Sequence, residues 1–219
     1  MSARTGRFVT LEGGEGAGKS TQIARLRRRL RQSGEIVVTT REPGGSPRAE
    51  FLRSVILDGT ARPFGPFAEA LLFASARADH LATTIRPALR RGDWVLCDRF
   101  TDSTRVYQGV LGAVPEPTIR ALERVSASDA TPHLTLILDV PAKLGLARAQ
   151  HRRELAGESV DRFEGEDLAY HSRIRTAFLA IAAAEPERCR VIDASGAAES
   201  VETLIWQAVE PLRGASDAG

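Results

Sequence analysis

The sequence has only two lysines in 219 residues, Lys19 and Lys143, so arginine supplies almost all of its positive charge. Basic residues number 30 and acidic residues 28, which leaves a formal net charge of +2. That balance gives no reason of its own to expect nucleic acid as a partner. Aromatic residues make up only 5%. We therefore interpret the basic run "RLRRRLRQ" at 25–32 as the solvated face of a helix, because no aromatic side chains accompany it to stack on bases.

Cysteines and long apolar runs are equally scarce. The two cysteines, Cys97 and Cys189, each lie in an apolar segment, which predicts buried, reduced side chains rather than a disulfide. No apolar run approaches the ~18 residues that cross a bilayer. The first ten residues, "MSARTGRFVT", lack the apolar segment of a signal peptide. We therefore expect a cytoplasmic protein with no membrane partner.

Short apolar segments alternate with longer segments of helical periodicity. The apolar segments show no strict polar–apolar alternation, as is typical of parallel strands covered on both faces. The expected strands are 8–12, 36–40, 94–98, 134–140 and 190–193. The expected helices are about 19–33, 47–58, 66–91, 115–128, 141–153, 166–185 and 198–212. This order predicts an α/β fold in a single domain over 1–213, followed by a disordered tail at 214–219.

Two polar segments are expected to be mobile. Residues 41–46, "REPGGS", form a loop between an expected strand and an expected helix. Residues 151–164, "HRRELAGESVDRFE", interrupt two helical patterns. The second segment predicts a mobile lid over about 148–162.

A glycine-rich segment, "GGEGAGKS" at 13–20, follows the first strand and precedes the first helix. Its spacing is that of a P-loop, whose glycines let backbone N–H groups meet phosphate oxygens. Lys19 would reach the β- and γ-phosphates, and the Ser20 hydroxyl would bind Mg²⁺. A glycine-rich turn without a ligand is the alternative, but the flanking strand and helix favour ATP-type nucleotide with Mg²⁺. The expected ATP-binding residues are Gly13, Gly14, Glu15, Gly16, Ala17, Gly18, Lys19, Ser20 and Thr21.

The third expected strand ends in "WVLCDRF", which brings a carboxylate to the edge where the P-loop lies. Asp98 is the expected second Mg²⁺-associated residue, with helix capping as the alternative. Arg99 follows it, and its guanidinium suits a second phosphate group through bidentate hydrogen bonding. A surface salt bridge is the alternative for Arg99.

Five motifs in this order resemble bacterial thymidylate kinases, a family of P-loop nucleoside monophosphate kinases. They are "EGGEGAGKST", "TREPGGS", "LLFASARADH", "DRFTDSTRVYQG" and "DRFE", and the resemblance covers about 7–195. It implies a five-stranded parallel sheet flanked by helices on both faces. It also implies transfer of the γ-phosphoryl group of ATP to dTMP, giving dTDP, by a homodimer.

The same resemblance assigns roles to residues that pattern alone leaves open. Phe73 would stack on thymine and Arg77 would bind the edge of the base, whereas Phe73 alone would be interpreted as core. Tyr107 would pack where a ribose 2′-OH lies and so favour deoxynucleotides. The residues expected to bind dTMP are Glu15, Arg53, Phe73, Arg77, Arg99, Ser103, Thr104, Tyr107 and Gln108.

Position 17 directs attention to the lid. Some family members carry an arginine inside the P-loop, but Ala17 stands there in this chain. The resemblance therefore implies that a lid arginine reaches the transferring phosphoryl group. Arg153 matches best, with Arg148 and Arg152 as alternatives, and the expected catalytic residues are Lys19, Arg99 and Arg153.

Three other functions compete with this interpretation. Another P-loop kinase would act on a different nucleotide or small alcohol, but the REPGG and YQG strings argue against it. A P-loop switch is disfavoured because a guanine-specific N-K-x-D string is missing. A catalytically idle scaffold would have no need of Lys19, Ser20, Asp98 and Arg99 together.

Overall fold

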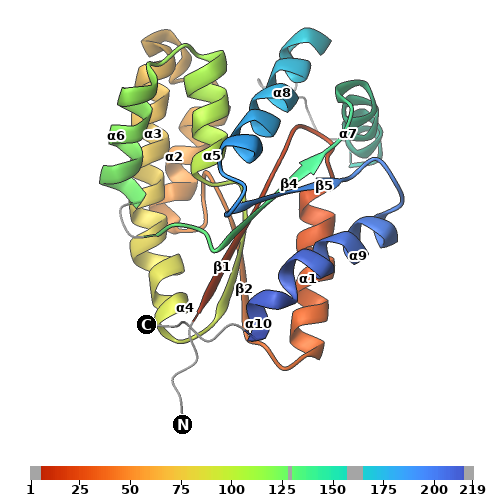
Figure 1. Ribbon diagram of the computed structural model, residues 1–219. Coiled ribbons are helices and arrows are strands. Elements are labelled where there is room, and N and C mark those ends of the chain that lie inside the picture. Colours follow the sequence, from red (N-terminus) through yellow and green to blue (C-terminus); the bar gives the residue numbers. More distant parts are fainter. Residues whose placement is uncertain (1–5, 128–129, 157–164, 215–219) are drawn as a thin grey trace.

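The fold is organised around a five-stranded, all-parallel sheet with the strand order β2-β3-β1-β4-β5 (Figure 1). The computed structural model describes residues 6–127, 130–156 and 165–214. The strands are β1 Arg7–Glu12, β2 Val37–Arg41, β3 Trp94–Asp98, β4 Leu134–Asp139 and β5 Cys189–Asp193. The expected parallel α/β architecture is confirmed. Because all strands run the same way, the P-loop after β1 and Asp98 at the end of β3 lie on one edge, and Leu11 pairs with Asp98 across the two strands.

Helices connect the strands in the order that the sequence predicts. The main helices are α1 Lys19–Gln32, α2 Pro47–Leu57, α3 Gly65–His80, α4 Arg86–Arg90, α6 Glu116–Ala127, α7 Ala142–Ala156, α8 Leu168–Ala184 and α9 Ala198–Val209. Shorter turns are η1 Arg62–Phe64, the π-helical η2 Leu81–Ile85, α5 Thr101–Thr104, the π-helical η3 Arg105–Leu111 and α10 Pro211–Gly214. The expected helix 66–91 is therefore a continuous run of α3, η2 and α4.

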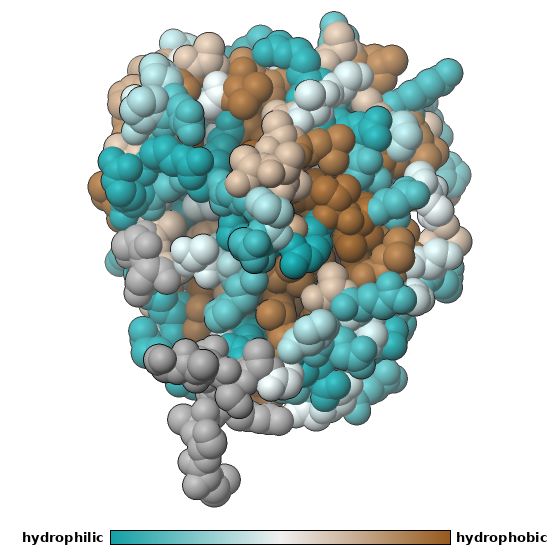
Figure 2. Space-filling view, in the orientation of Figure 1, coloured by the Kyte–Doolittle hydropathy of each residue, from teal (hydrophilic) through white to brown (hydrophobic). Residues whose placement is uncertain are grey.

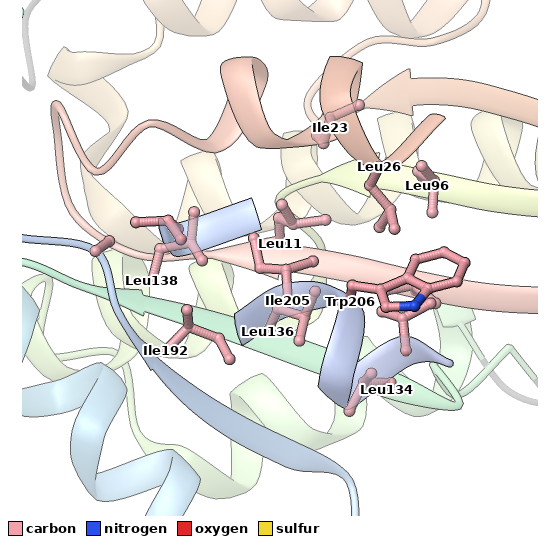
Figure 3. Close-up of a cluster of buried hydrophobic side chains, with 14 of the residues drawn as sticks. Leu11, Ile23, Leu26, Leu96, Leu134, Leu136, Leu138, Ile192, Ile205 and Trp206 are labelled. Carbon is pink, nitrogen blue, oxygen red and sulfur yellow. The ribbon is translucent and has the colours of Figure 1, made fainter. Parts of the chain in front are cut away.

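The helices cover both faces of the sheet. Helices α1 and α9 pack on one face, and α4 and α8 pack on the other (Figure 1). Alternate strand residues supply the two layers, because successive side chains of a strand point to opposite faces. Leu134, Leu136 and Leu138 join Leu26 of α1 and Ile205 of α9 in the larger cluster (Figure 3). On the face viewed in Figure 2, hydrophilic side chains surround apolar ones that reach the surface near its middle.

Both cysteines are buried and free, as the sequence predicts. Burial raises the pKa of the Cys97 thiol well above its ordinary value. Within the described residues, no helix is long and apolar enough to span a membrane.

Three segments differ from expectation. The sequence analysis predicted no helix over 101–111, where α5 and η3 run directly after β3. Helix α7 extends to Ala156, beyond the predicted end at 153, and helix α10 includes Gly214 of the predicted tail. Residues 157–164 of the predicted lid and its "DRFE" motif, together with 215–219, lie outside the described residues.

The loop 41–46 was predicted to be mobile, but its surroundings hold it. Glu42, Pro43 and Gly44 are buried. Gly45 O accepts a hydrogen bond from the Thr84 hydroxyl at 2.8 Å, and the Ser46 hydroxyl donates to Asp79 at 2.6 Å. The sequence could not indicate this packing, because the partners lie 33 to 39 residues further along the chain.

Candidate active site

A cleft with a volume of about 430 Å³ opens at the carboxyl ends of β1, β2 and β3. Crevices at this edge of a parallel sheet are the usual position of ligand sites in α/β folds. We describe the cleft in two halves. The P-loop half is lined by Glu15, Gly16, Ala17, Gly18, Lys19, Ser20, Thr21, Asp98 and Arg152. The remaining part, called the acceptor half, is lined by Arg41, Glu42, Pro43, Arg53, Leu57, Phe73, Arg77, Arg99, Phe100, Ser103, Thr104, Tyr107, Gln108 and His171.

The P-loop turns tightly between β1 and α1. Gly16 and Gly18 have φ angles of 64° and 87°, in the left-handed region that favours glycine. A Cβ at Gly16 would also collide with the carbonyl oxygen of Gly145. The Lys19 ammonium donates to the carbonyls of Gly13 and Gly14 at 3.2 and 3.0 Å. Burial, together with the charge of Arg99, lowers the pKa of Lys19. Gly13 and Gly14 themselves lie behind the cleft, in a smaller hollow beside β4.

Ser20 and Asp98 meet at the floor of the P-loop half. The Ser20 hydroxyl donates to Asp98 Oδ2 at 3.0 Å. Asp98 Oδ1 is buried and has no hydrogen-bond partner among the described residues. These are hard oxygen donors, which suit Mg²⁺ bound through one carboxylate, a hydroxyl and nucleotide phosphates. No group of three or more potential metal-ligating His, Cys, Asp or Glu side chains occurs within the described ranges. The residues therefore fit a cation that depends on a bound nucleotide for its remaining ligands.

Arg99 lies between the two halves of the cleft. Its backbone has a φ of 70°, which is rare for a residue other than glycine. The Leu11 carbonyl accepts its N–H at 3.0 Å, and the Cys97 thiol donates to its carbonyl at 3.0 Å. The guanidinium donates to Gly13 O and to the Ser103 hydroxyl, each at 3.2 Å. These bonds stabilise a strained turn that directs a half-buried cation into the cleft.

Glu12 is a site residue that the sequence analysis missed. It is fully buried at the end of β1 and accepts hydrogen bonds from the Phe100 N–H and the Ser103 hydroxyl, both at 2.6 Å. Burial, with the nearby charge of Asp102, raises the pKa of Glu12 to about 8. An acidic residue ending an otherwise apolar strand was the available signal. Its carboxyl group supports the segment that carries Arg99 and Ser103.

The acceptor half of the cleft contains the residues that the resemblance associates with a nucleobase. Arg77 is buried and donates from Nε to Glu42 Oε2 at 2.8 Å and from Nη2 to the Thr104 hydroxyl at 2.9 Å. Phe73 precedes Arg77 by one helical turn of α3 and lines the same space. Arg53 also lines it and donates to Pro43 O at 2.8 Å.

The missed segment α5–η3 supplies the opposite wall. Ser103, Thr104, Tyr107 and Gln108 all face the cleft from it. Arg99 lies over the Tyr107 ring, 5.2 Å from its centroid. π-Helical turns are frequent at functional sites, because they change which side chains face one direction. The structure thus brings together all nine residues predicted to bind the acceptor.

The three arginines of α7 are placed differently. Arg152 lines the cleft and donates to Glu15 Oε1 at 3.1 Å. Arg148 instead donates to the carbonyls of Ala194 and Ser195, both at 2.7 Å. Arg153, which the sequence favoured, is not among the residues that line the cleft in the described part of the chain. Burial alone would raise the pKa of Glu15, but Lys19, Arg99 and Arg152 together lower it to about 2.

Two histidines are also buried beside the cleft. His171 of α8 lines it, and neither ring nitrogen has a hydrogen-bond partner among the described residues. His80, at the end of α3, lies 3.1 Å from Glu42.

The fold and the cleft define a class of protein before any comparison is made. A P-loop beside a carboxylate is the arrangement that binds a nucleoside triphosphate, and the same cleft continues past Arg99 to Arg77 and Phe73. This arrangement is that of a P-loop phosphotransferase acting on a second small molecule.

Comparison with known proteins narrows the class to a family. The thymidylate kinase family model matches residues 11–205. A thymidylate kinase of Bradyrhizobium sp. (strain ORS 278) is 55% identical over 204 residues, which cover 93% of this chain and 89% of the relative. A thymidylate kinase of Nitrobacter winogradskyi is 51% identical over 216 residues, covering 99% and 93%. The crystal structure of thymidylate kinase from Ehrlichia chaffeensis aligns with a TM-score of 0.75 at 28% identity, covering 94% of this chain and 99% of that one. The chain belongs to the thymidylate kinase family.

Proposed function

We propose that this chain transfers the γ-phosphoryl group of ATP to dTMP, giving dTDP and ADP. The observation that carries the proposal is one continuous cleft whose P-loop half and acceptor half meet at Arg99. Family membership supports the same substrates, because the relatives are named thymidylate kinases.

The P-loop half of the cleft supports ATP binding through its backbone N–H groups and the charge of Lys19. The P-loop amides and the N-terminus of α1 would face phosphate oxygens, and the bond from Lys19 to the Gly14 carbonyl already holds its ammonium beside the loop. Mg²⁺ would be held by Ser20 and Asp98. When bound, it would neutralise charge on the β- and γ-phosphates.

The acceptor half supports a pyrimidine deoxynucleotide. Arg77 has only donors, so it favours a base edge that presents a carbonyl oxygen over one that presents an amino group. Phe73 would offer a flat apolar face to the ring of the base, and Tyr107 would lie beside the sugar. Arg99 would align the acceptor phosphate with the P-loop, which is the step that positioning can accelerate most.

No strong general base is required for this reaction. A monophosphate is an anion at neutral pH and can attack the γ-phosphorus once the two groups are aligned. The residues needed are therefore cations that balance developing charge. Arg99 and an arginine of α7 would supply them.

We also propose that the chain forms a homodimer. Four large apolar side chains of α2, η1 and α3 remain exposed. They are Phe51 (68% exposed), Phe64 (75%), Phe67 (51%) and Leu71 (42%). Such a group of exposed apolar residues is typical of an interaction surface. Light scattering would give the oligomeric state. A cytoplasmic location and the absence of nucleic-acid partners stay predictions of the sequence.

A coupled ADP-release assay tests the function. ATP would be offered with dTMP, dUMP, UMP, AMP or CMP. The control is the Lys19→Ala variant, which lacks the cation that would bind the β- and γ-phosphates. We expect turnover with dTMP, weaker turnover with dUMP, and loss of turnover in Lys19→Ala with cooperative unfolding preserved. Turnover confined to AMP or CMP would contradict the proposal.

A further inference from the structure

A chain of buried and partly buried hydrogen bonds runs from strand β2 to Arg77. The Thr40 hydroxyl lies 2.6 Å from His80 Nε2, and His80 Nδ1 lies 3.1 Å from Glu42 Oε1. Glu42 Oε2 accepts from Arg77 Nε at 2.8 Å. Arg77 then donates to the Thr104 hydroxyl at 2.9 Å. The series joins β2, the loop 41–46, α3 and α5.

We propose that His80 is a positioning residue for base recognition, which acts on Arg77 through Glu42. This inference rests on the proposed function, because it assumes that the base lies against Arg77. His80 does not line the cleft within the described residues, so it has no contact of its own with a substrate there. Its influence must pass through the carboxylate that it shares with Arg77.

The protonation pattern gives the chain a direction. A carboxylate only accepts hydrogen bonds, so Nδ1 of His80 carries the proton that it donates to Glu42. In the neutral imidazole, Nε2 then accepts from the Thr40 hydroxyl. Both oxygens of Glu42 are thereby held by separate donors, and the carboxylate plane is fixed. Because Nε of Arg77 binds one of those oxygens, the plane of Glu42 sets the direction of the guanidinium.

Burial makes this arrangement costly to disturb. His80 is 0% exposed, and the side chains of Arg77 and Glu42 are 2% and 4% exposed. Loss of the His80 donor would leave Glu42 Oε1 without that bond in a site that is almost closed to solvent. The carboxylate and Arg77 would then rotate to share the remaining donors. Arg77 would no longer point at the base in one orientation.

The loop 41–46 is shaped around the same imidazole. A Cβ at Gly45, which has a φ of 81°, would collide with His80 Nε2 and with Thr40 Oγ1. Glycine at this position therefore allows His80 to reach Thr40. The loop and Arg77 are thus positioned by one buried group.

The test compares His80→Leu, His80→Asn and Thr40→Val with the unaltered chain. His80→Leu removes both bonds, His80→Asn keeps a donor near Glu42, and Thr40→Val removes only the outer partner. The matched control is His133→Leu, because His133 accepts a bond from Phe8 N–H away from the cleft. Initial rates would be measured with dTMP and with dCMP, which presents an amino group where dTMP presents a carbonyl.

We expect His80→Leu to raise KM for dTMP on the order of ten-fold, the size of one lost bond to a charged group, with kcat and KM for ATP nearly unchanged. The preference for dTMP over dCMP should fall with it, and His80→Asn should restore part of both. Thr40→Val should shift KM in the same direction by less, and His133→Leu should not shift it.

Two results would overturn the inference. The first is an unchanged KM for dTMP together with an unchanged dTMP/dCMP preference in both His80→Leu and Thr40→Val. The second is an equal loss of kcat/KM for dTMP and for dCMP together with a lower Tm, which would indicate a structural role alone. If His80→Leu fails to fold, Thr40→Val decides the matter by the same two quantities. Absence of dTMP turnover in the unaltered chain would instead overturn the proposed function, and this inference with it.

Discussion

Arg152 of α7 donates to Glu15 of the P-loop across 3.1 Å, although 137 residues separate them in the sequence. The contact places a cation from α7 beside the loop that would hold the γ-phosphate. Arg153, one residue further on, is absent from the cleft lining within the described residues. We therefore propose Arg152 for the role that sequence resemblance assigns to Arg153.

We predict that Arg152→Ala lowers kcat far more than Arg153→Ala does. An arginine that stabilises the transferring phosphoryl group contributes ~10³-fold or more to kcat in related reactions. Single-turnover rates with ATP and dTMP would measure the effect. Arg152→Lys keeps the charge and should retain part of the rate. A greater loss in Arg153→Ala would return the role to Arg153.

Arg99→Ala should weaken the use of dTMP and leave ATP binding nearly intact. Arg99 contacts Gly13 O and Ser103, and no other cation of the acceptor half adjoins the P-loop so closely in the described chain. We expect KM for dTMP to rise roughly 100-fold, in line with loss of a partly buried charge-assisted contact. Displacement of a fluorescent ATP analogue would report donor affinity. A large loss of ATP affinity would instead mean that Arg99 binds a phosphate of ATP. The control is Arg120→Ala, which removes an arginine from the exposed surface.

Tyr107→Ala should reduce discrimination against a 2′-hydroxyl. Its ring is half-buried, faces the cleft and lies beside Arg99. The ratio of kcat/KM for dUMP to that for UMP isolates the hydroxyl, because these two substrates share one base. We expect that ratio to fall about ten-fold, the range of one steric contact. Tyr107→Phe keeps the ring and should preserve the ratio, whereas an unchanged ratio in Tyr107→Ala would refute exclusion by Tyr107.

Asp98→Asn should raise the Mg²⁺ concentration that gives half-maximal rate. Asparagine keeps the shape and the bond to Ser20 but removes the negative charge that attracts a hard cation. A rise of about ten-fold is expected for loss of one carboxylate from a site completed by phosphates. Magnesium titration at saturating ATP would measure it. Asp193→Asn, at the exposed end of β5, serves as the control.

Glu12 should make stability depend on pH between its two pKa values. Burial holds the folded-state pKa near 8 against an ordinary value of 4.5, so the folded chain keeps a proton that the unfolded chain has lost. Raising pH through this window therefore destabilises the fold through Glu12, and the effect levels off above 8. Glu12→Gln lacks the titration. The Tm of Glu12→Gln minus that of the unaltered chain should therefore increase from pH 5 to pH 8. The increase should be several degrees if Glu12 changes the free energy of unfolding by about 2 kcal/mol over this range.

The exposed carboxylate Glu187 offers a control for this measurement. The difference in Tm between Glu187→Gln and the unaltered chain should stay level over the same pH range. A level difference for Glu12→Gln as well would contradict the raised pKa.

The parts that could be predicted from the sequence depend on neighbouring residues. Gly13 to Ser20 form a P-loop because backbone conformation and the start of α1 are encoded within one short segment. The strands were predicted to within a residue or two, since each is a compact apolar run between polar segments. Asp98 and the P-loop were expected together because parallel strands end on one edge.

The helix over 101–111 escaped prediction for a local reason. Thr101, Ser103 and Thr104 are weak helix formers, and Gly109 interrupts the segment. Packing decides its conformation instead. Arg105 binds Glu123 and Glu185, and the neighbouring Asp102 binds Arg188, so partners from α6 and from the turn before β5 hold it.

The sequence by itself determined the phosphate-binding loop, the parallel sheet and the resemblance to thymidylate kinases, because those signals are local strings or regular periods. Only the tertiary structure decided that Arg152 faces the P-loop, that Glu12 is buried behind Arg99, and that His80 reaches Arg77 through Glu42. Each of these depends on the rotation of a helix or on a contact between distant segments. Such relations arise when both faces of the sheet are covered, and no stretch of neighbouring residues encodes them.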